Sequence, residues 1–384
     1  MSTTVATTES PLHRPIRIRG LELPNRIVMS PMTRTFSPGG VPTEEVAGYY
    51  RRRAEGGTGL IVTEGVGIDH PGAVDHPDVP NLHAPAARDS WRRVVDSVHE
   101  AGGRIIPQLW HVGPLFGAMR DVPETTPMRP SGVWGDPGVT SYSQDYVDRA
   151  VTPTRAMTES DIADVVAAFA DAARTSVELG FDGIAVHGGH GYLLDSFLWA
   201  STNRRDDAWG GDLLRRTAFP VAVVRAIRGA IGDDLPIVYR FSQHKQQDFT
   251  ARLADNPEDL GTILSALVDA GVDVLDASSR RFDAPAFEGS DLSLAGWAKK
   301  TTGAITMGVG CVGLGKSLRD GRLAGGTVES VDNIDELERR IGTGEFDLAA
   351  IGRLHLADPR IAETLRGGGP LPTFDRVAHE SILT

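Results

Sequence analysis

Two histidines and a tyrosine lie within one short segment, His187-Gly-Gly-His190-Gly-Tyr192. Imidazoles three residues apart can both donate a hydrogen bond to one small acceptor, such as a carbonyl oxygen. A tyrosine hydroxyl two residues further on can deliver a proton in the same pocket. The glycines allow a flat ligand to approach closely. The segment therefore suggests a catalytic turn, although paired structural or metal-binding histidines would look the same.

Two further polar residues interrupt apolar runs. Burying the Arg240 guanidinium is costly unless it meets an anion or a strong acceptor. A salt bridge to Glu64 or Asp276 is the structural alternative for this arginine. Gln108 can donate and accept side by side, which suits the edge of a flavin or a pyrimidine-like ring. It could also be a core glutamine whose hydrogen bonds are satisfied within the protein.

Glycines end two later apolar runs, at Gly308-Val-Gly310 and at Gly352-Arg353. Backbone N–H groups exposed at such turns can hold a phosphate, and Arg353 adds a charged fork. Either motif alone is weak, because glycine often simply ends a strand. The two motifs together favour a phosphorylated cofactor.

The segment Ser30-Pro31-Met32-Thr33 leaves the first apolar run. Pro31 makes the chain stiff and extended at this point. Thr33 could therefore aim its hydroxyl at the edge of a cofactor, unless the segment is an ordinary strand exit.

Eight short apolar runs carry these residues at or near their C-terminal ends. Most runs are continuous rather than alternating, as is typical of strands buried on both faces. Helical patterns lie between them, and strand–helix alternation predicts a parallel sheet. No run resembles a polar edge strand, so we predict an α/β fold, a closed (βα)8 TIM barrel. The runs are 26–30, 59–65, 104–110, 182–188, 237–242, 272–279, 304–310 and 346–352, and the expected helices are 43–55, 85–101, 158–180, 213–230, 257–270 and 331–341.

The barrel prediction explains how distant residues could form one site, because the C-terminal ends of barrel strands converge on one face. We expect a single domain over 15–370, with a disordered N-terminal tail at 1–14 and a C-terminal tail at 371–384. Long segments after the third and sixth strands, 112–154 and 280–294, should cap the mouth. Phe282 in the second of these is expected to shape the pocket, with Phe287 and Trp297 nearby.

Composition narrows the range of partners. The 384 residues carry a formal net charge of −12, which argues against nucleic acid or an anionic membrane surface as a partner. One cysteine, Cys311, cannot form an internal disulfide or hold an iron–sulfur cluster, so a reducing cytoplasm fits best. The N-terminal residues lack an apolar signal region, and no run of 18 apolar residues occurs. A small-molecule substrate is expected, and a homo-oligomer is compatible with the sequence.

With these pieces together, the chain resembles the Old Yellow Enzyme family of FMN-dependent ene reductases from about Leu21 to Arg366. The order and spacing of the motifs make the resemblance specific. The motifs are Asn25–Arg34, Gln108–His111, Phe181–Tyr192, Asn203–Asp206 followed by Gly210-Gly211, and Gly352–Pro359.

The resemblance implies FMN as cofactor, with NAD(P)H as a transient reductant. Hydride would pass from NAD(P)H to flavin N5 and then to the β-carbon of an α,β-unsaturated carbonyl or nitro compound. His187 and His190 would bind the activating oxygen, and Tyr192 would protonate the α-carbon. The implied FMN contacts are Ser30, Pro31, Met32, Thr33, Gly65, Gln108, Arg240, Gly308, Gly310, Gly352 and Arg353. Among them, Arg240 would stabilise the anionic reduced flavin.

Other functions stay open at this point. Within the family, flavin-dependent desaturation of a carbonyl-containing metabolite would run the reaction in reverse. A metal-dependent barrel hydrolase could use His187 and His190 as ligands with Asp276, but no matching ligand set is found elsewhere in the sequence. A flavoprotein without catalysis would have no need of Tyr192.

Overall fold

Eight parallel strands close into a barrel in the computed structural model, which describes residues 10–119, 125–317 and 326–384. Seven of the barrel strands lie within one of the eight apolar runs, and the strand in the run 59–65 extends to Gly67. The (βα)8 prediction is therefore confirmed. The strands follow the order β11-β3-β4-β5-β6-β7-β8-β9 around the barrel. They are β3 (Ile27–Met29), β4 (Leu60–Gly67), β5 (Ile105–Trp110), β6 (Ile184–His187), β7 (Ile237–Phe241), β8 (Val274–Ser278), β9 (Ile305–Val309) and β11 (Leu348–Ile351).

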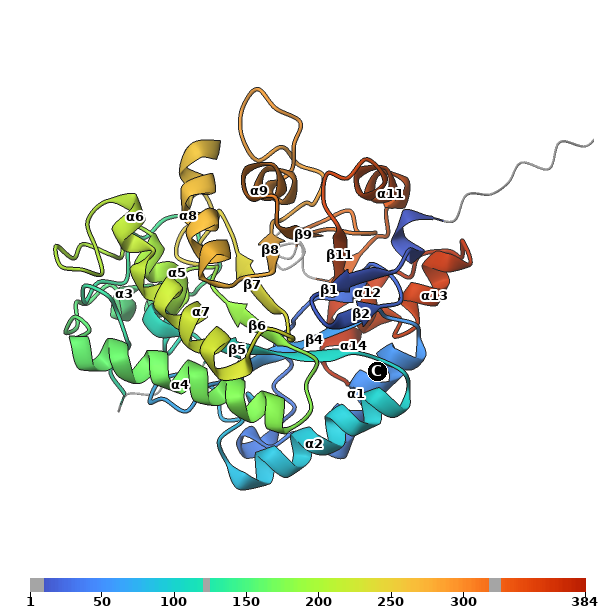
Figure 1. The fold of residues 1–384 in the computed structure, drawn as a ribbon, viewed down its shortest axis with the longest axis horizontal. Coiled ribbons are helices and arrows are strands. Elements are labelled where there is room, and N and C mark those ends of the chain that lie inside the picture. Colours follow the sequence, from blue (N-terminus) through green and yellow to red (C-terminus); the bar gives the residue numbers. More distant parts are fainter. Residues whose placement is uncertain (1–9, 120–124, 318–325) are drawn as a thin grey trace, which may run out of the picture.

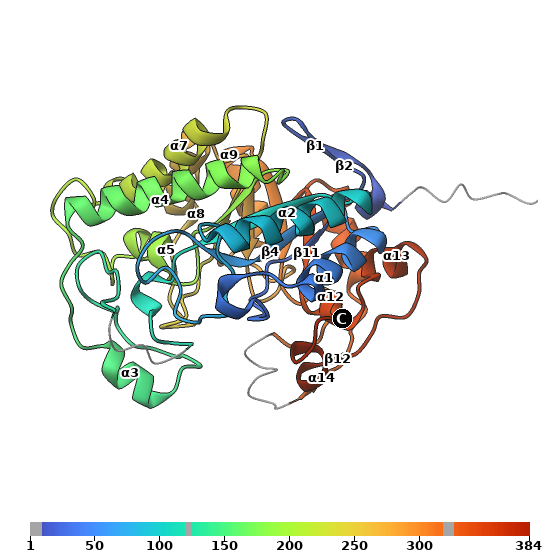
Figure 2. The same ribbon diagram turned by 90° about the horizontal axis from the view of Figure 1, so that it is seen from below.

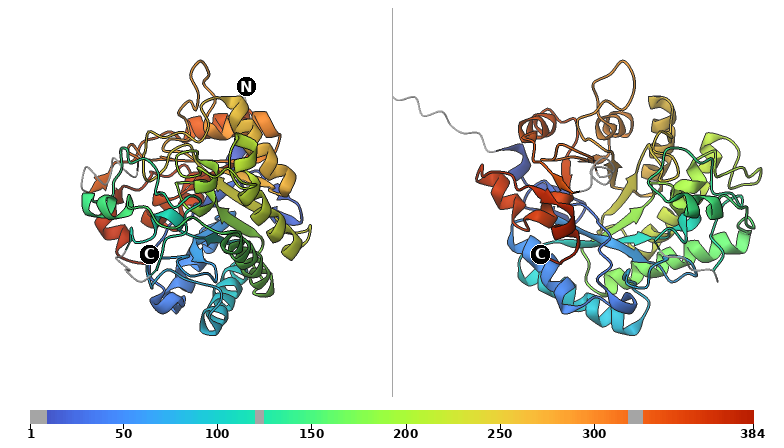
Figure 3. Two further views of the ribbon diagram at one scale, coloured as in Figure 1. Left: turned by 90° about the vertical axis from the view of Figure 1, so that its left-hand side faces the viewer. Right: turned by 180° about the vertical axis from the view of Figure 1, so that it is seen from behind.

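Helices surround the strands on the outside (Figures 1 and 3). They are α1 (Glu44–Glu55), α2 (Pro85–Glu100), α4 (Glu159–Glu178), α7 (Ala218–Ile231), α8 (Pro257–Ala270), α9 (Leu294–Thr302) and α11 (Ile334–Gly342). Thr158 and Asp161 form a reciprocal capping box at the start of α4.

One expected helix, 213–230, is divided into α6 (Leu213–Arg216) and α7. Pro220 lies in the first turn of α7 and has no N–H to donate to the carbonyl of Arg216, so a continuous helix would lose a hydrogen bond there. Helix α9 was not among the expected helices. It begins at the end of the segment that was predicted as the second cap.

Apolar side chains form two separate layers. One layer fills the barrel interior and the other lies between the barrel and the outer helices. A hairpin of β1 (Ile16–Ile18) and β2 (Leu21–Leu23) joins the interior layer. Figure 2 shows this hairpin at the end of the molecule opposite α3 (Gln144–Ala150) and α14 (Arg376–Glu380). The interior is therefore packed, and ligand space is left at the other end of the barrel.

The mouth carries more regular structure than the sequence suggested. The expected cap at 112–154 contains a 3-10 turn, η3 (Gly113–Leu115), and helix α3. Further elements at or near the mouth are α5 (Leu193–Leu198), β10 (Thr327–Val328), α12 (Arg353–Ala357) and β12 (Phe374–Asp375). Helix α13 (Ile361–Arg366) follows α12 and lies near the Gly56–Gly57 turn that precedes β4. A 3-10 turn, η2 (Pro38–Gly40), follows β3.

Both expected tails need correction where the structure describes them. Residues 10–14 are ordered, because η1 (Pro11–His13) buries Leu12 completely; residues 1–9 lie outside the described ranges. The C-terminal segment contributes β12, which pairs with β10, and α14. The Arg34 guanidinium holds this segment by donating to the carbonyls of His379, Glu380 and Ile382.

Candidate active site

A cavity of about 610 Å³ lies at the C-terminal end of the barrel. That size is ordinary for a site that binds a cofactor or a small molecule. Most of the residues singled out from the sequence line it together, as the convergence of strand ends predicted. They are Ser30, Pro31, Met32, Thr33, Gln108, His187, His190, Tyr192, Arg240, Gly310, Gly352 and Arg353.

Two expected contact residues, Gly65 and Gly308, are not among the lining residues. A Cβ atom at Gly65 would lie 2.4 Å from Cε3 of Trp110, and one at Gly308 would lie 3.0 Å from the Phe346 ring. Each glycine therefore leaves room for an aromatic side chain of the protein.

Strand register explains why the polar groups of the cavity are neighbours. His187 on β6 is paired with Arg240 on β7, and Arg240 is paired with Asp276 on β8. Gln108 on β5 is paired with Ala185 on β6. The hydrogen-bond register of the barrel thus places the amide, one histidine and the arginine on three consecutive strands.

The His187, His190 and Tyr192 rings form one aromatic cluster. The His187 ring centroid lies 5.0 Å from that of His190 and 4.7 Å from that of Tyr192. Trp110 packs edge-on against Tyr192, with 5.1 Å between ring centroids, and stacks on His187. Contacts of this kind restrict side-chain rotation, so the cluster is held in place before any ligand binds.

Both histidines are held in the neutral form. Burial is the main cause that lowers the pKa of His187 and of His190 well below the usual value, and the positive charge of Arg240 adds to it. The Gly189 N–H donates to Nδ1 of His187 over 3.5 Å, which leaves the proton of that ring on Nε2. Nε2 of His190 lies 2.8 Å from Oγ of Ser278. A neutral imidazole can still donate one hydrogen bond to a ligand oxygen.

Arg240 forms a salt bridge with Asp276, one of the two carboxylates that the sequence offered as partners. This salt bridge uses only part of the guanidinium. Its Nε donates to Oδ2 of Asp276 over 2.6 Å, and one Nη donates to Oγ of Ser30 over 2.9 Å. The guanidinium also lines the cavity. Asp276 therefore orients Arg240, which keeps a positive charge facing the ligand space.

Gln108 carries an unsatisfied donor into the cavity wall. Its side chain is 3% exposed, and Nε2 has no hydrogen-bond partner among the described residues. A buried amide without a partner is unfavourable and is rare in native proteins. The group therefore suits a ligand that presents an acceptor there, as the pyrimidine edge of a flavin does.

The opposite part of the cavity suits a phosphate. Gly310 has φ +128°, and a Cβ there would lie 2.4 Å from the Ser279 carbonyl oxygen, so only glycine fits. Arg353 lines the same region, with Nη2 donating to the Lys316 carbonyl over 2.8 Å. One cation and a glycine turn can bind a phosphate dianion. With Gln108 and Arg240, the residues present fit FMN.

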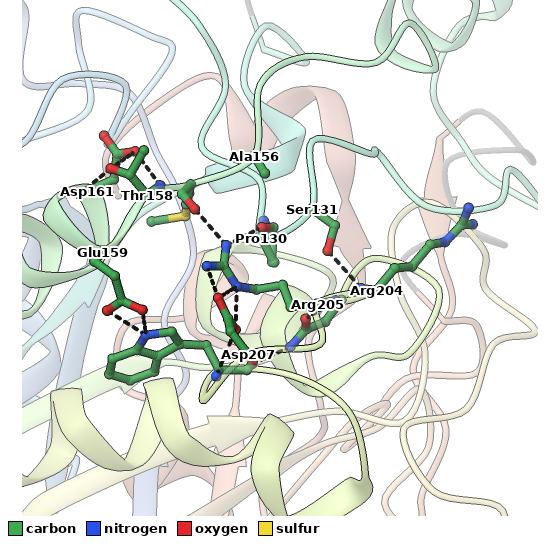
Figure 4. A network of polar contacts seen from close by, with 12 residues as sticks. Pro130, Ser131, Ala156, Thr158, Glu159, Asp161, Arg204, Arg205 and Asp207 are labelled. Carbon is green, nitrogen blue, oxygen red and sulfur yellow. Dashed lines mark hydrogen bonds and ion pairs between the residues drawn. The ribbon is translucent and has the colours of Figure 1, made fainter.

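The Asn203–Asp206 motif acts at a distance from the cavity. Arg205 donates to the carbonyls of Pro130 and Met157 over 2.8 and 2.6 Å and is paired with Asp207 (Figure 4). The Arg204 N–H donates to Oγ of Ser131 over 2.7 Å. This network ties the chain after α5 to the part of the cap that leads into α4. The motif therefore stabilises the loops at the mouth of the barrel.

The sequence analysis missed some residues that line the cavity and gave other residues a role that the structure does not support. Ser278 is the last residue of β8 and His244 lies shortly after the end of β7, so their place near strand ends could have marked both as candidates. Phe282 was expected to shape the pocket, but it is 1% exposed and belongs to the apolar layer outside the barrel. Asp276, considered as a metal ligand, binds Arg240. In the described ranges, no three or more histidine, cysteine or acidic residues are grouped so that they could hold a metal ion.

Fold and site together define a (βα)8-barrel enzyme whose cavity has donors for a planar heteroaromatic ring at one end and for a phosphate at the other. The model of the NADH:flavin oxidoreductase / NADH oxidase family matches residues 11–371. The chain belongs to this family, and its similarity to Old Yellow Enzyme proteins confirms the expected resemblance.

Relatives of similar length support this assignment. Flavin oxidoreductase hxnT of Emericella nidulans is 32% identical over 387 residues, covering 95% of this chain and 93% of the relative. 12-Oxophytodienoate reductase 1 of Oryza sativa subsp. japonica is 30% identical over 380 residues, covering 97% and 90%. The structure of morphinone reductase superposes with a TM-score of 0.77 at 25% identity, covering 96% of this chain and 92% of that one. A second morphinone reductase structure, at 26% identity and a TM-score of 0.74 over 94% and 91% of the two chains, is a complex with tetrahydroNAD.

These findings make the protein an FMN-dependent oxidoreductase with a nicotinamide as reductant. No helix among the described residues is long and apolar enough to span a membrane.

Proposed function

We propose that the protein reduces the activated C=C bond of an α,β-unsaturated carbonyl or nitro compound, with NAD(P)H as the source of hydride. The observation that carries this proposal is the cluster of His187, His190 and Tyr192. All three line the cavity that also contains Gln108 and Arg240. Two neutral hydrogen-bond donors and one phenolic proton donor are the groups that such a reduction needs from the protein.

The two histidines bind and polarise the activating oxygen of the substrate. Each can donate one N–H, and their ring centroids are 5.0 Å apart. Donors fixed in advance around an oxygen stabilise the negative charge that develops there during the reaction. Because both imidazoles are neutral, they stabilise this charge without giving up their protons.

Tyr192 moves the proton. Its hydroxyl delivers a proton to the α-carbon as hydride reaches the β-carbon, and a positioned acid of this kind contributes about 10²- to 10⁴-fold to a rate. Contacts with Trp110 and His187 on two sides orient its ring. FMN, when bound, supplies the hydride transfer between nicotinamide and substrate.

The remaining lining residues hold the cofactor. Gln108 would donate to the pyrimidine edge, Arg240 would offset the negative charge of the reduced flavin, and Arg353 with the Gly310 turn would bind the phosphate. Ser30 orients Arg240, while Pro31, Met32 and Thr33 would contact the flavin. Gly65 and Gly308 contribute indirectly, by making room for the Trp110 ring, which itself lines the cavity, and for the Phe346 ring.

Anaerobic stopped-flow absorbance tests the proposal. Flavin absorbance of the purified holoenzyme should bleach with NADPH and return with cyclohexenone. In Tyr192→Phe the bleaching should be unchanged, while the return slows by about 10²-fold or more. Tyr146→Phe is the matched control, because Tyr146 is buried but does not line the cavity.

Two results would contradict the assignment. An unchanged return in Tyr192→Phe would refute the proton-donor role. Wild-type protein that ignores enones and nitroalkenes, but is bleached by a saturated ketone, would show that the reaction runs toward desaturation.

A further inference from the structure

The turn that carries His190 and Tyr192 has an unfavourable backbone conformation. His190 has φ 63° and Gly191 has φ 82°, so two consecutive residues occupy the left-handed region. For a residue with a side chain this conformation is unfavourable, and it persists only where the surroundings enforce it. The neighbours of the turn must therefore supply the constraint.

Four hydrogen bonds hold the turn from two sides, and one of them runs from Nε2 of Gln247 to the Gly191 carbonyl over 3.4 Å. The His190 N–H donates to Oγ of Ser242 over 2.8 Å, and the His190 carbonyl accepts from the Gln246 N–H over 3.0 Å. The Gly191 N–H donates to Oδ2 of Asp195 over 2.6 Å. Ser242 and Gln246 belong to the loop after β7, whereas Asp195 lies in the first turn of α5.

Lys245 joins these two sides. Its ammonium donates to Oδ1 and Oδ2 of Asp195 over 2.6 and 2.8 Å, and it approaches the Ser242 carbonyl at 3.5 Å. Both side chains of the pair are completely buried. His190 and Lys245 are also paired as an isolated β-bridge. One ion pair thus connects the loop after β7 to the start of α5 directly beside the His190–Gly191 turn.

Stability alone does not explain a fully buried ion pair. The desolvation of two charges can exceed their mutual attraction, so apolar or neutral replacements of similar volume are often as stable or more so. Neither Asp195 nor Lys245 lines the cavity, so neither binds the substrate or the cofactor directly. What the pair provides is a fixed geometry for the turn between them.

We propose that the Asp195–Lys245 ion pair is a positioning device, which locks the His190–Gly191 turn so that the His190 and Tyr192 rings face the cavity together. This inference rests on the proposed roles of those two rings. The carboxylate accepts from the Gly191 N–H on one side of Tyr192, and Asp195 itself lies in the first turn of α5 on the other side. The ammonium keeps the carboxylate from rotating away, because it binds both of its oxygens.

The test distinguishes an effect of the ion pair on the position of the turn from an effect on the stability of the protein. The neutral variant Asp195→Asn/Lys245→Met keeps an amide oxygen near Gly191 and leaves no unpaired buried charge. It should fold even if Lys245→Met alone does not. Lys299→Met is the matched control, because Lys299 forms a 2.6 Å ion pair with Asp347, which also binds the Thr306 N–H near the start of β9.

Three measurements are made on holoenzyme: the melting temperature, the rate of flavin reoxidation by cyclohexenone, and a crystal structure. The neutral double variant should melt within a few degrees of wild type and retain FMN. Its reoxidation should slow by about 10- to 100-fold, the scale expected when reacting groups are displaced by about 1 Å. Its crystal structure should show His190 outside the left-handed region or the Tyr192 ring displaced.

A double variant with wild-type reoxidation and an unchanged turn would overturn the inference. The same rate loss in Lys299→Met would also overturn it, because any lost ion pair would then have the effect. If wild-type protein did not reduce enones, the proposed function would be refuted, but the proposed role of the ion pair would not. The crystallographic comparison of the turn would still decide whether the pair positions it.

Discussion

Replacing Gln108 should change cofactor affinity and protein stability in different directions. Gln108 Nε2 is buried without a partner among the described residues, so the protein without cofactor bears the cost of a desolvated donor. FMN removes that cost by presenting an acceptor. Gln108→Met keeps a side chain of similar length without polar atoms. It should therefore weaken FMN binding without destabilising the apoprotein.

The magnitude follows from the burial of the amide. Leaving a buried polar group unsatisfied costs about 1–3 kcal/mol. The substitution removes this cost from the apoprotein, and it leaves an acceptor of bound FMN without its donor at similar expense. Together these two effects weaken binding by about 2–6 kcal/mol. An affinity difference of about 1.4 kcal/mol is tenfold, so the Kd for FMN should rise by about 30-fold or more. The apoprotein should melt at the wild-type temperature or slightly above it.

The assay is a fluorescence titration of apoprotein with FMN, combined with thermal melting of the apoprotein. Gln243→Met is the control, because Gln243 donates to the Ala254 carbonyl and accepts from the Leu253 and Ala254 N–H groups. It should lower stability and leave FMN affinity unchanged. Apoprotein destabilised by Gln108→Met, with unchanged FMN affinity, would refute the reasoning and make Gln108 an ordinary core amide.

Three further predictions concern charge and packing. Arg353→Gln should weaken FMN binding about tenfold or more by removing a charge-assisted contact to the phosphate, but it should leave the affinity for riboflavin unchanged in parallel titrations. Burial raises the pKa of Glu64 from 4.5 to about 7, so between these values the native protein holds a proton that the unfolded chain has lost, and stability falls as pH rises. In Glu64→Gln the side-chain oxygen can still accept from the Arg34 and Thr35 N–H groups. The substitution should remove about 3 kcal/mol of this pH dependence. A melting temperature that falls equally in wild type and Glu64→Gln from pH 5 to 8 would contradict this prediction. Phe282→Ala should cost about 3–5 kcal/mol of unfolding free energy in denaturant titrations while leaving the KM for cyclohexenone unchanged, whereas an altered KM with normal stability would place Phe282 in the pocket.

The barrel and the residues at its strand ends that line the cavity could be predicted because one rule connects them. Continuous apolar runs define the strands, and the C-terminal ends of parallel barrel strands share one face. Gln108, His187 and Arg240 could therefore be brought together from segments far apart in the sequence. Gly65 and Gly308 show the limit of this rule. A position near a strand end does not reveal whether a residue faces the cavity or packs against an aromatic side chain of the protein.

The residues that orient the site were much harder to predict. Asp195 interrupts the apolar stretch Leu193–Leu198, and this charge was a signal that a buried partner exists. Lys245 gave no such signal, since it lies in a polar loop where a lysine is ordinary. Their pairing depends on how two loops cross at the mouth, and neither composition nor periodicity specifies that path.

The difference between these two kinds of residue has a physical basis. A group that binds a ligand must keep a donor or acceptor unsatisfied by the protein, as Gln108 does with Nε2. A group that orients another is satisfied within the protein, as Asp195 is by Lys245 and the Gly191 N–H. Preorganised catalysis needs both kinds, because an unsatisfied donor lowers a barrier only where its direction is already fixed. Buried ion pairs beside unsatisfied polar groups should therefore identify the supporting residues of this site, and those pairs become visible only once the loops at the mouth are placed.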